Sequence, residues 1–330
     1  MARVHLALAV HAPWLAQAVP AVAPSAHPPL GVGALELNLA PGFDHAEMRH
    51  WLAFIAHANG AFLWHLHAPL APDAAGWQAV AALAAALPVG DSPSFVVVRA
   101  PNVATSQIDP TATVAWLRQL RQMLPQSVQL AVELGWHAAP AQTLRRRWQR
   151  WRQQAAQRAR FAGRPQGVGS GLGAVVTAAP RVPAADALDP PWAAGTTRGW
   201  NVAGTRQAVV AVVAAVDMPG VSVAWDMAHD WLGGLWSGTA DWTTVPPAAF
   251  LERVGYVRLH DVADNGTAHL PLLVGNVPYT TQLRMLLRTN FTGPVALAMQ
   301  YGAQAARYGS RQETQARSLA VARRVLRLTN

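Results

Sequence analysis

Two residue types are missing from this 330-residue chain, and each absence excludes a kind of chemistry. The sequence has no cysteine, so neither disulfides nor thiolate-bound metals can form. All 26 basic residues are arginine. Without lysine the protein has neither a Schiff-base nucleophile nor the lysine that a P-loop places on a nucleotide phosphate. Thiol, disulfide and lysine-based mechanisms are therefore excluded.

Charged residues are scarce as well, at 13%, whereas hydrophobic residues make up 52%. This balance predicts elements that are buried on at least one face, as parallel strands wrapped by helices are. No apolar run is long enough to cross a membrane. The apolar run that follows Met1 is too short for a signal peptide and is more typical of a first strand. We expect a soluble, cytoplasmic protein, and a homo-oligomer is compatible with the sequence.

The net charge of +9 comes mostly from one segment. Seven arginines lie between Arg145 and Arg160, interleaved with Trp148 and Trp151, and the rest of the chain is close to balanced. Such a segment could bind nucleic acid or an anionic membrane, but a solvated surface helix is the commoner outcome for this pattern. Nucleic acid is therefore kept as an unfavoured partner, through Arg145–Arg160 alone.

Short apolar runs alternate with amphipathic segments along most of the chain, which predicts parallel strands joined by helices. Asp109-Pro110 is a typical helix start, with proline at the first helical position. The helices are expected near residues 44–58, 74–87, 108–124, 204–217, 278–289 and 310–328. The strands are expected at Val4–Val10, Ala34–Leu39, Phe62–Ala68, Phe95–Ala100, Val128–Gly135, Val221–Met227, Val254–His260 and Pro294–Tyr301.

Eight strands alternating with helices indicate a closed barrel more than an open sheet. We predict one α/β domain over residues 1–330, a (β/α)8 TIM barrel with an insertion after the fifth strand. The insertion covers about residues 138–200 and contains the basic segment, a glycine-rich stretch and a Pro/Ala-rich tract. Its glycines follow no strand, so they make a poor dinucleotide fingerprint.

Polar residues gather where the expected strands end. In a TIM barrel the catalytic groups sit at this C-terminal end, and charged side chains there are costly to bury unless they are paired or bind something. These candidates are Glu36, Asn38, His65, His67, Arg99, Glu133, Asp226, His229, Arg258, His260, Asp261 and Gln300.

Several of these residues belong to short motifs in a characteristic order. An early strand ends in His67-Ala68-Pro69, and a middle strand ends in Glu133 within LAVELG. Asp226-Met227-Ala228-His229 follows, then Leu259-His260-Asp261 and a loop that opens with His269-Leu270-Pro271. In these motifs the chain resembles the xylose isomerase-like TIM-barrel superfamily of sugar-phosphate isomerases and epimerases, which also contains endonuclease IV-type repair enzymes. The resemblance covers nearly the whole barrel except the insertion.

This resemblance implies a sugar or sugar-acid isomerase or epimerase that uses one divalent metal for proton transfer next to a carbonyl. Mn²⁺, Mg²⁺ or Zn²⁺ would be held by Glu133, Asp226 and His260, because carboxylates and imidazoles suit these ions. Glu133 and His229 would be the catalytic residues. A small anionic or sugar-like substrate would be bound by His67, Arg99, Arg258, His269 and Gln300.

The chain also departs from the family pattern at ligand positions. Arg258 and Ala298 stand at two of the expected metal positions, and Arg99 and Thr267 stand where endonuclease IV-type members have further ligands. Arginine is permanently protonated and cannot bind a metal. Two interpretations therefore stay open: a metalloenzyme with a changed ligand set, or a non-catalytic relative that binds an anionic molecule or acts as a scaffold. An endonuclease IV-like phosphodiesterase is the least favoured function.

For a few residues a structural role competes with a functional one. His65 is expected to be a core histidine, and Asp261 could cap the loop that follows it. Glu36 could pair with Arg99 or Arg258. Trp225 and Trp231 flank the Asp226–His229 motif, where they could wall a pocket or pack in the core.

Overall fold

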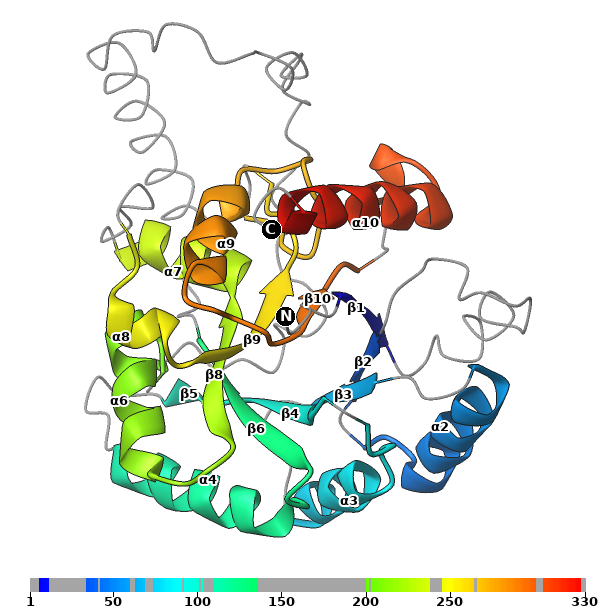
Figure 1. Ribbon diagram of the computed structural model, residues 1–330, viewed down its shortest axis with the longest axis vertical. Helices are drawn as coiled ribbons and strands as arrows, with labels where there is room; N and C mark the ends of the chain where they lie inside the picture. Colours follow the sequence, from blue (N-terminus) through cyan, green and yellow to red (C-terminus); the bar gives the residue numbers. More distant parts are fainter. Residues whose placement is uncertain are drawn as a thin grey trace, which may run out of the picture.

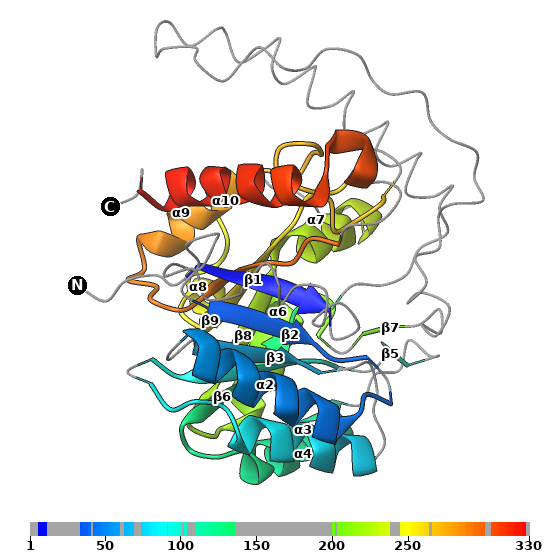
Figure 2. The same cartoon turned by 90° about the vertical axis from the view of Figure 1, so that its right-hand side faces the viewer.

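A computed structural model describes residues 6–11, 34–40, 42–59, 63–68, 74–90, 92–100, 102–103, 110–135, 200–201, 203–237, 245–263, 266–300 and 305–327. Its centre is a closed barrel of parallel strands, and the helices lie around the outside of the barrel (Figures 1 and 2). Among the described helices none is long and apolar enough to span a membrane. The expected insertion, including Arg145–Arg160, lies outside the described residues except at Trp200.

The eight barrel strands follow one another around the barrel in sequence order, with the last strand beside the first. They are β1 (Leu6–His11), β2 (Ala34–Asn38), β3 (Leu63–His67), β4 (Ser94–Arg99), β6 (Val128–Glu133), β8 (Val221–Asp226), β9 (Val254–Leu259) and β10 (Val295–Leu297). All eight predicted strands are therefore confirmed. The last is shorter than the predicted Pro294–Tyr301, although the N–H of Ala298 still donates to the carbonyl of Leu259.

The predicted helices are confirmed as α2 (His45–Asn59), α3 (Ala74–Ala85), α4 (Pro110–Met123), α6 (Arg206–Val216), α9 (Tyr279–Leu287) and α10 (Arg311–Arg327). Three short helices and one small sheet were not predicted: α7 (Met227–Ser237), α8 (Ala248–Leu251), η5 (Ala305–Tyr308), and the antiparallel pair β5 (Asn102–Val103) with β7 (Trp200–Asn201). Pro110 is the first residue of α4, as its fixed φ and missing N–H favour.

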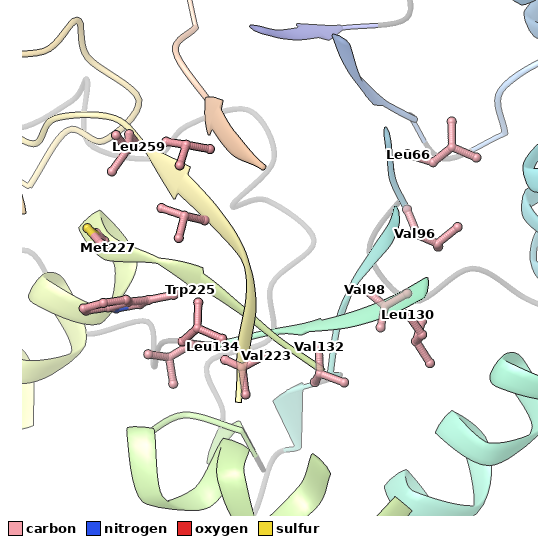
Figure 3. Close-up of a cluster of buried hydrophobic side chains, with 14 of the residues drawn as sticks. Leu66, Val96, Val98, Leu130, Val132, Leu134, Val223, Trp225, Met227 and Leu259 are labelled. Carbon is pink, nitrogen blue, oxygen red and sulfur yellow. The ribbon is translucent and has the colours of Figure 1, made fainter. Parts of the chain in front are cut away.

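Side chains of each strand alternate between the barrel interior and the surrounding helices. In β8 the residues Val223 and Trp225 belong to the outer core, which packs between strands and helices, and Figure 3 shows both among its buried side chains. The other face of β8 places Ala224 in a separate inner cluster with Ala131 of β6 and Tyr256 of β9. Asp226 follows Ala224 on this inner face, so the interior changes from apolar to charged towards the C-terminal ends of the strands.

Candidate functional site

The candidate site is built by alternation and strand register. The inner faces of β2, β3, β4, β6, β8 and β9 carry polar residues near their C-terminal ends, so neighbouring strands bring these residues together. Register pairs Arg99 of β4 with Glu133 of β6. It also pairs Asp226 of β8 with Arg258 of β9, and Glu36 of β2 with His65 of β3.

Glu133 is fully buried and surrounded by hydrogen-bond donors. Its Oε2 accepts a hydrogen bond from Nε2 of His67 at 2.6 Å, and its Oε1 accepts from Arg99 and from Nδ1 of His229 at 3.2 Å. Nη1 of Arg258 lies 3.5 Å from Oε2. Burial would raise the pKa of Glu133, but Arg99, His229, His67 and Arg258 outweigh it and hold the pKa well below its usual range. Glu133 is therefore a carboxylate.

Asp226 is the second fully buried carboxylate. It accepts from the backbone N–H of His229 at 3.0 Å, and its oxygens lie 3.1 Å from Nδ1 of His229 and 3.0 Å from Nε2 of His260. Burial alone would raise the pKa of Asp226, but His229 and His260 bring it well below the usual range. For His229 the balance has the opposite sign: burial lowers its pKa, and Asp226 and Glu133 raise it above the ordinary value.

Arg258 crosses the barrel interior from β9 to β2. Its Nε and Nη2 donate to Oε1 of Glu36 at 3.3 and 3.1 Å, and Nη2 also donates to Oδ1 of Asn38 at 3.1 Å. On the other side Nη1 donates to Oδ2 of Asp226 at 3.4 Å. Only 3% of Arg258 is exposed. Burial would lower its pKa, but three carboxylates raise it, so this guanidinium is permanently charged.

His260 and His269 are stacked, with ring centroids 4.1 Å apart. Nδ1 of His260 accepts the backbone N–H of His269 at 3.0 Å, which leaves the ring proton on Nε2, towards Asp226. Nδ1 of His269 donates to the carbonyl of Ala298 at 2.7 Å, which leaves the proton-accepting lone pair on Nε2. Burial is the largest cause that holds the pKa of His269 well below its usual range, and the neighbouring His260, His229 and Arg258 lower it further. His269 is thus neutral, and it lies beside His229, whose pKa is shifted in the opposite direction.

The loop that carries His269 is held by Asp261. The Asp261 carboxylate accepts from the backbone N–H groups of Val262, Gly275 and Val277 at 2.9–3.1 Å. The backbone of Asp261 also pairs with Leu270. His269 has a φ of 60°, a left-handed conformation that costs energy for a side chain with a Cβ. The expected capping role of Asp261 is confirmed, and it fixes the position of His269.

A smaller group of polar residues lies deeper in the barrel interior. The hydroxyl of Tyr256 donates to Oε2 of Glu36 at 2.8 Å, and the ring of His65 packs edge-on against Tyr256 and Phe95. The Nδ1 of His65 accepts the backbone N–H of Phe95 at 3.2 Å. His65 is fully buried, so its expected core position is confirmed, and Glu36 pairs with Arg258 rather than with Arg99.

The ligand atoms for a metal converge, yet they do not fit one while Arg258 is present. Glu133, Asp226 and His229 offer atoms within 4.8 Å of one another. However, Nη1 of Arg258 lies 3.4 Å from Asp226 and 3.5 Å from Glu133, between the two carboxylates. Charges of +1 and +2 that are roughly 4 Å apart repel by on the order of 8 kcal/mol at an effective dielectric constant of about 20. The repulsion opposes an ion at this place.

The histidines do not supply an alternative ligand set. His229, His260 and His269 also offer atoms within 4.8 Å of one another. Nε2 of His260 carries the proton that binds Asp226, and its Nδ1 accepts from the backbone, so neither nitrogen has a lone pair for a metal. His260 was predicted to be a metal ligand; in this arrangement it is instead a hydrogen-bond donor to Asp226.

The structure brings nearly all predicted site residues into one cluster. His67 and Arg99 form its outer edge, since 12% of each side chain is exposed. Gln300 joins through its backbone N–H, which donates to the carbonyl of His269. Trp225 lies outside the cluster: its indole packs edge-on against Phe250 and donates to Asp230 at 2.8 Å. Trp225 and Trp231 are core residues, so a role in walling a pocket is not supported.

Comparison of the three-dimensional structure with solved proteins adds to this geometry. L-ribulose 3-epimerase superposes with a TM-score of 0.57 at 10% identity, covering 99% of this chain and 95% of that one. D-allulose 3-epimerase from Methylomonas sp. in complex with D-allulose gives 0.56 at 12% identity, covering 98% of each chain. A xylose isomerase-like TIM barrel protein from Mycobacterium smegmatis in complex with magnesium gives 0.50 at 12% identity, covering 95% and 88%.

This chain has the fold of the xylose isomerase-like TIM barrels. At 10 to 12% identity the likeness concerns the fold, and the resemblance read from the motifs is confirmed at that level. No family model matches the sequence, and no curated protein matches it significantly. The function of this barrel therefore has to be argued from its own residues.

Proposed function

We propose that this barrel moves a proton on a sugar or sugar acid, as an isomerase or epimerase does, using His229 and His269 as acid and base. The observation that carries the proposal is the placement of these two imidazoles, whose ring centroids are 5.3 Å apart. His229 lies between two carboxylates, which favour its charged form, whereas His269 donates to a backbone carbonyl and keeps a lone pair on Nε2. Neighbouring groups in opposite protonation states are what acid–base catalysis requires.

The proposed step conserves protons and electrons. Neutral His269 takes the proton from the carbon next to the substrate carbonyl, and charged His229 gives a proton to the carbonyl oxygen. The C–H bond electrons form the C=C bond of an enediol, and the C=O π electrons take up the proton from His229. In isomerisation His269 delivers its proton to the other enediol carbon, and the hydroxyl proton on the first carbon passes to His229 as the new C=O bond forms. In epimerisation the solvent supplies a proton to the opposite face of the first carbon, His269 loses its proton to the solvent, and the enediol hydroxyl proton returns to His229 as the C=O bond reforms. Glu133 and Asp226 keep His229 charged and oriented. Glu133 was predicted to be catalytic, and in this proposal it has a supporting role, because at least three proton donors already occupy its oxygens.

Substrate oxygens would be recognised at the outer edge of the cluster. Nε of Arg99 is buried and has no hydrogen-bond partner among the described residues. A buried donor in this state is typical of a site that binds a water or a ligand. A substrate carboxylate, carbonyl or hydroxyl oxygen suits this N–H. Arg258 was predicted to share this role, but its groups are directed at Glu36, Asn38 and Asp226 inside the barrel.

The proposal is tested by exchange of substrate hydrogen with solvent. The protein is incubated in D₂O with ketoses, aldoses and sugar acids, starting with D-allulose and L-ribulose, and deuterium next to the carbonyl is followed by NMR. We expect exchange for at least one compound. His269→Gln and His229→Asn should each slow it by about 100-fold or more, in line with the usual contribution of acid–base groups.

The control is His50→Asn, which changes an exposed histidine on α2 and should leave exchange unchanged. Exchange that persists in both site variants would refute the proposal. A second candidate, binding of an anionic molecule without turnover, is favoured by the complete neutralisation of Glu133. It is identified by a ligand that raises the melting temperature of the wild type without any exchange.

A further inference from the structure

Three fully buried carboxylates surround one guanidinium in the barrel interior. Glu36, Glu133 and Asp226 are each 0% exposed, and each has an oxygen within 3.5 Å of a nitrogen of Arg258. Buried carboxylates need a compensating charge, because burial of an unpaired ion is strongly unfavourable. Arg99 compensates Glu133 from its outer side. For Glu36, Arg258 is the sole cationic partner among the described residues.

The place of Arg258 is fixed by the strand and not by a mobile loop. Tyr256 and Arg258 lie on the inner face of β9, and the register of β8 with β9 sets Arg258 directly opposite Asp226. Nη2 donates to both Glu36 and Asn38, and Nη1 donates to Asp226, so both ends of the guanidinium are held. The planar fork of arginine presents its donors in a fixed geometry, whereas lysine has a single ammonium at the end of its side chain.

We infer that the Arg258 guanidinium takes the place of a divalent cation between Glu133 and Asp226, so that the site is complete without a metal ion and becomes a metal site when this guanidinium is removed. The charge and position of the guanidinium are those that a cation bound by both carboxylates would need. The inference does not depend on the proposed proton transfer. It concerns what neutralises the carboxylates, whatever the cluster then does.

Removing the guanidinium should expose a nearly complete ligand set. Glu133, Asp226 and His229 already offer atoms within 4.8 Å of one another. Carboxylate oxygens and an imidazole nitrogen suit Mn²⁺, Mg²⁺ or Zn²⁺. Glu36 would remain as a third buried carboxylate, so the empty space would carry an excess of negative charge that a divalent ion can compensate. Loss of the positive Arg258 also removes the repulsion that opposes such an ion.

The test uses Arg258→Met, which keeps much of the side-chain volume and removes the charge. Wild type and variant are stripped with EDTA, and melting temperature is measured at pH 7.5 with increasing Mn²⁺. Bound manganese is counted by elemental analysis after desalting. The matched control is Arg206→Met, because Arg206 pairs with the single carboxylate of Asp230 on the outside of the barrel. That variant loses a partly buried ion pair without leaving two carboxylates side by side.

We expect wild type and Arg206→Met to bind no stoichiometric manganese and to show no change in melting temperature. Arg258→Met should melt lower than the wild type without metal, and Mn²⁺ at about 100 times its Kd should raise its melting temperature by about 5 °C. Stoichiometric manganese on the wild type, or an Arg258→Met protein that is insensitive to Mn²⁺, would overturn the inference.

A variant that fails to fold still gives an answer. If Arg258→Met is insoluble, it is refolded with and without Mn²⁺, alongside the double variant Glu36→Gln/Arg258→Met, which removes one carboxylate together with the arginine. Recovery of folded protein by Mn²⁺ in either variant supports the inference, and failure in both contradicts it. A wild type that turns over no sugar leaves the inference intact, whereas turnover that EDTA abolishes and Mn²⁺ restores would overturn it.

Discussion

Replacing Asp261 by alanine should destabilise this protein far more than replacing a surface aspartate that also binds backbone N–H groups. Asp261 is 1% exposed and its carboxylate accepts from the N–H groups of Val262, Gly275 and Val277. The Ala variant leaves the buried N–H groups of Val262 and Val277 and the half-buried N–H of Gly275 without their acceptor. Asp44, at the start of α2, accepts from Ala46 and Glu47 in an exposed position, where water can replace it.

The magnitudes follow from these contacts. A buried donor that loses its acceptor costs about 1–3 kcal/mol, so the two buried donors amount to at least about 2 kcal/mol for Asp261→Ala, and the half-buried donor of Gly275 adds to this loss. Loss of an exposed helix cap costs about 1 kcal/mol, which is the value expected for Asp44→Ala. Asp261→Asn should fall between them, because the amide oxygen can still accept from two donors while its NH₂ group faces the third.

Urea unfolding of the three variants and the wild type measures these differences. We expect the order Asp44→Ala, Asp261→Asn, Asp261→Ala in increasing loss of unfolding free energy, with unchanged m-values. Asp261→Ala should also weaken whatever the site binds, because the loop that it holds carries His269. If Asp261→Ala and Asp44→Ala lose the same free energy within about 0.5 kcal/mol, burial is not what makes Asp261 important, and the reasoning fails.

Two further predictions concern the same region. Gly275→Ala should cost about 2 kcal/mol or more of unfolding free energy, because its Cβ would overlap the carbonyl oxygen of Val262. The control Gly90→Ala has no atom within 4 Å of the new Cβ, so it should change the unfolding free energy by less than about 1 kcal/mol. Equal urea midpoints for the two variants would contradict this prediction. Stability should also fall as the pH drops below about 4. In the folded protein the pKa values of Glu133 and Asp226 lie well below their ordinary values. As the pH falls, these carboxylates are therefore protonated in the unfolded chain before they are protonated in the folded protein, and the stabilisation that they contribute above about pH 4 is lost. Unfolding free energies from pH 7 to 3 should fall less steeply in Glu133→Gln, and parallel curves would refute the assignment.

The barrel could be predicted from sequence because its strands carry two signals at once. In VSVAWD of β8 the outer residues Val223 and Trp225 are large and apolar, and the inner ones run from Ser222 to Asp226. The same alternation in the other strands shows which polar residues at the strand ends face the barrel interior. The short helix α7 was missed because it begins directly at the strand end, with Met227, and contains Gly233-Gly234, which lower helix propensity.

The candidate site was predictable as a set of residues but not as a set of contacts. Alternation showed that Arg258 and His260 share a face, and the sequence alone left Glu36 a choice between Arg99 and Arg258. Which partner each charge takes depends on register between strands far apart in sequence, and on the reach of a long side chain across the barrel. The protonation pattern of His260 and His269 depends on a single backbone N–H and a single carbonyl, which no motif encodes.

An arginine and a divalent ion neutralise the same carboxylates but leave different possibilities for a ligand. A bound ion can hold a substrate oxygen at an open coordination position and stabilise the charge that develops there. Arg258 cannot, because its nitrogens are directed at Glu36, Asn38 and Asp226 and only 3% of the residue is exposed. Stabilisation of a developing charge must then come from Arg99, at the outer edge of the cluster, and from His229. If proton exchange depends on His229 and His269, the barrel has kept proton transfer with a different electrophile. If the barrel binds anions without proton exchange, Arg258 explains why the carboxylates that it neutralises take no part in catalysis.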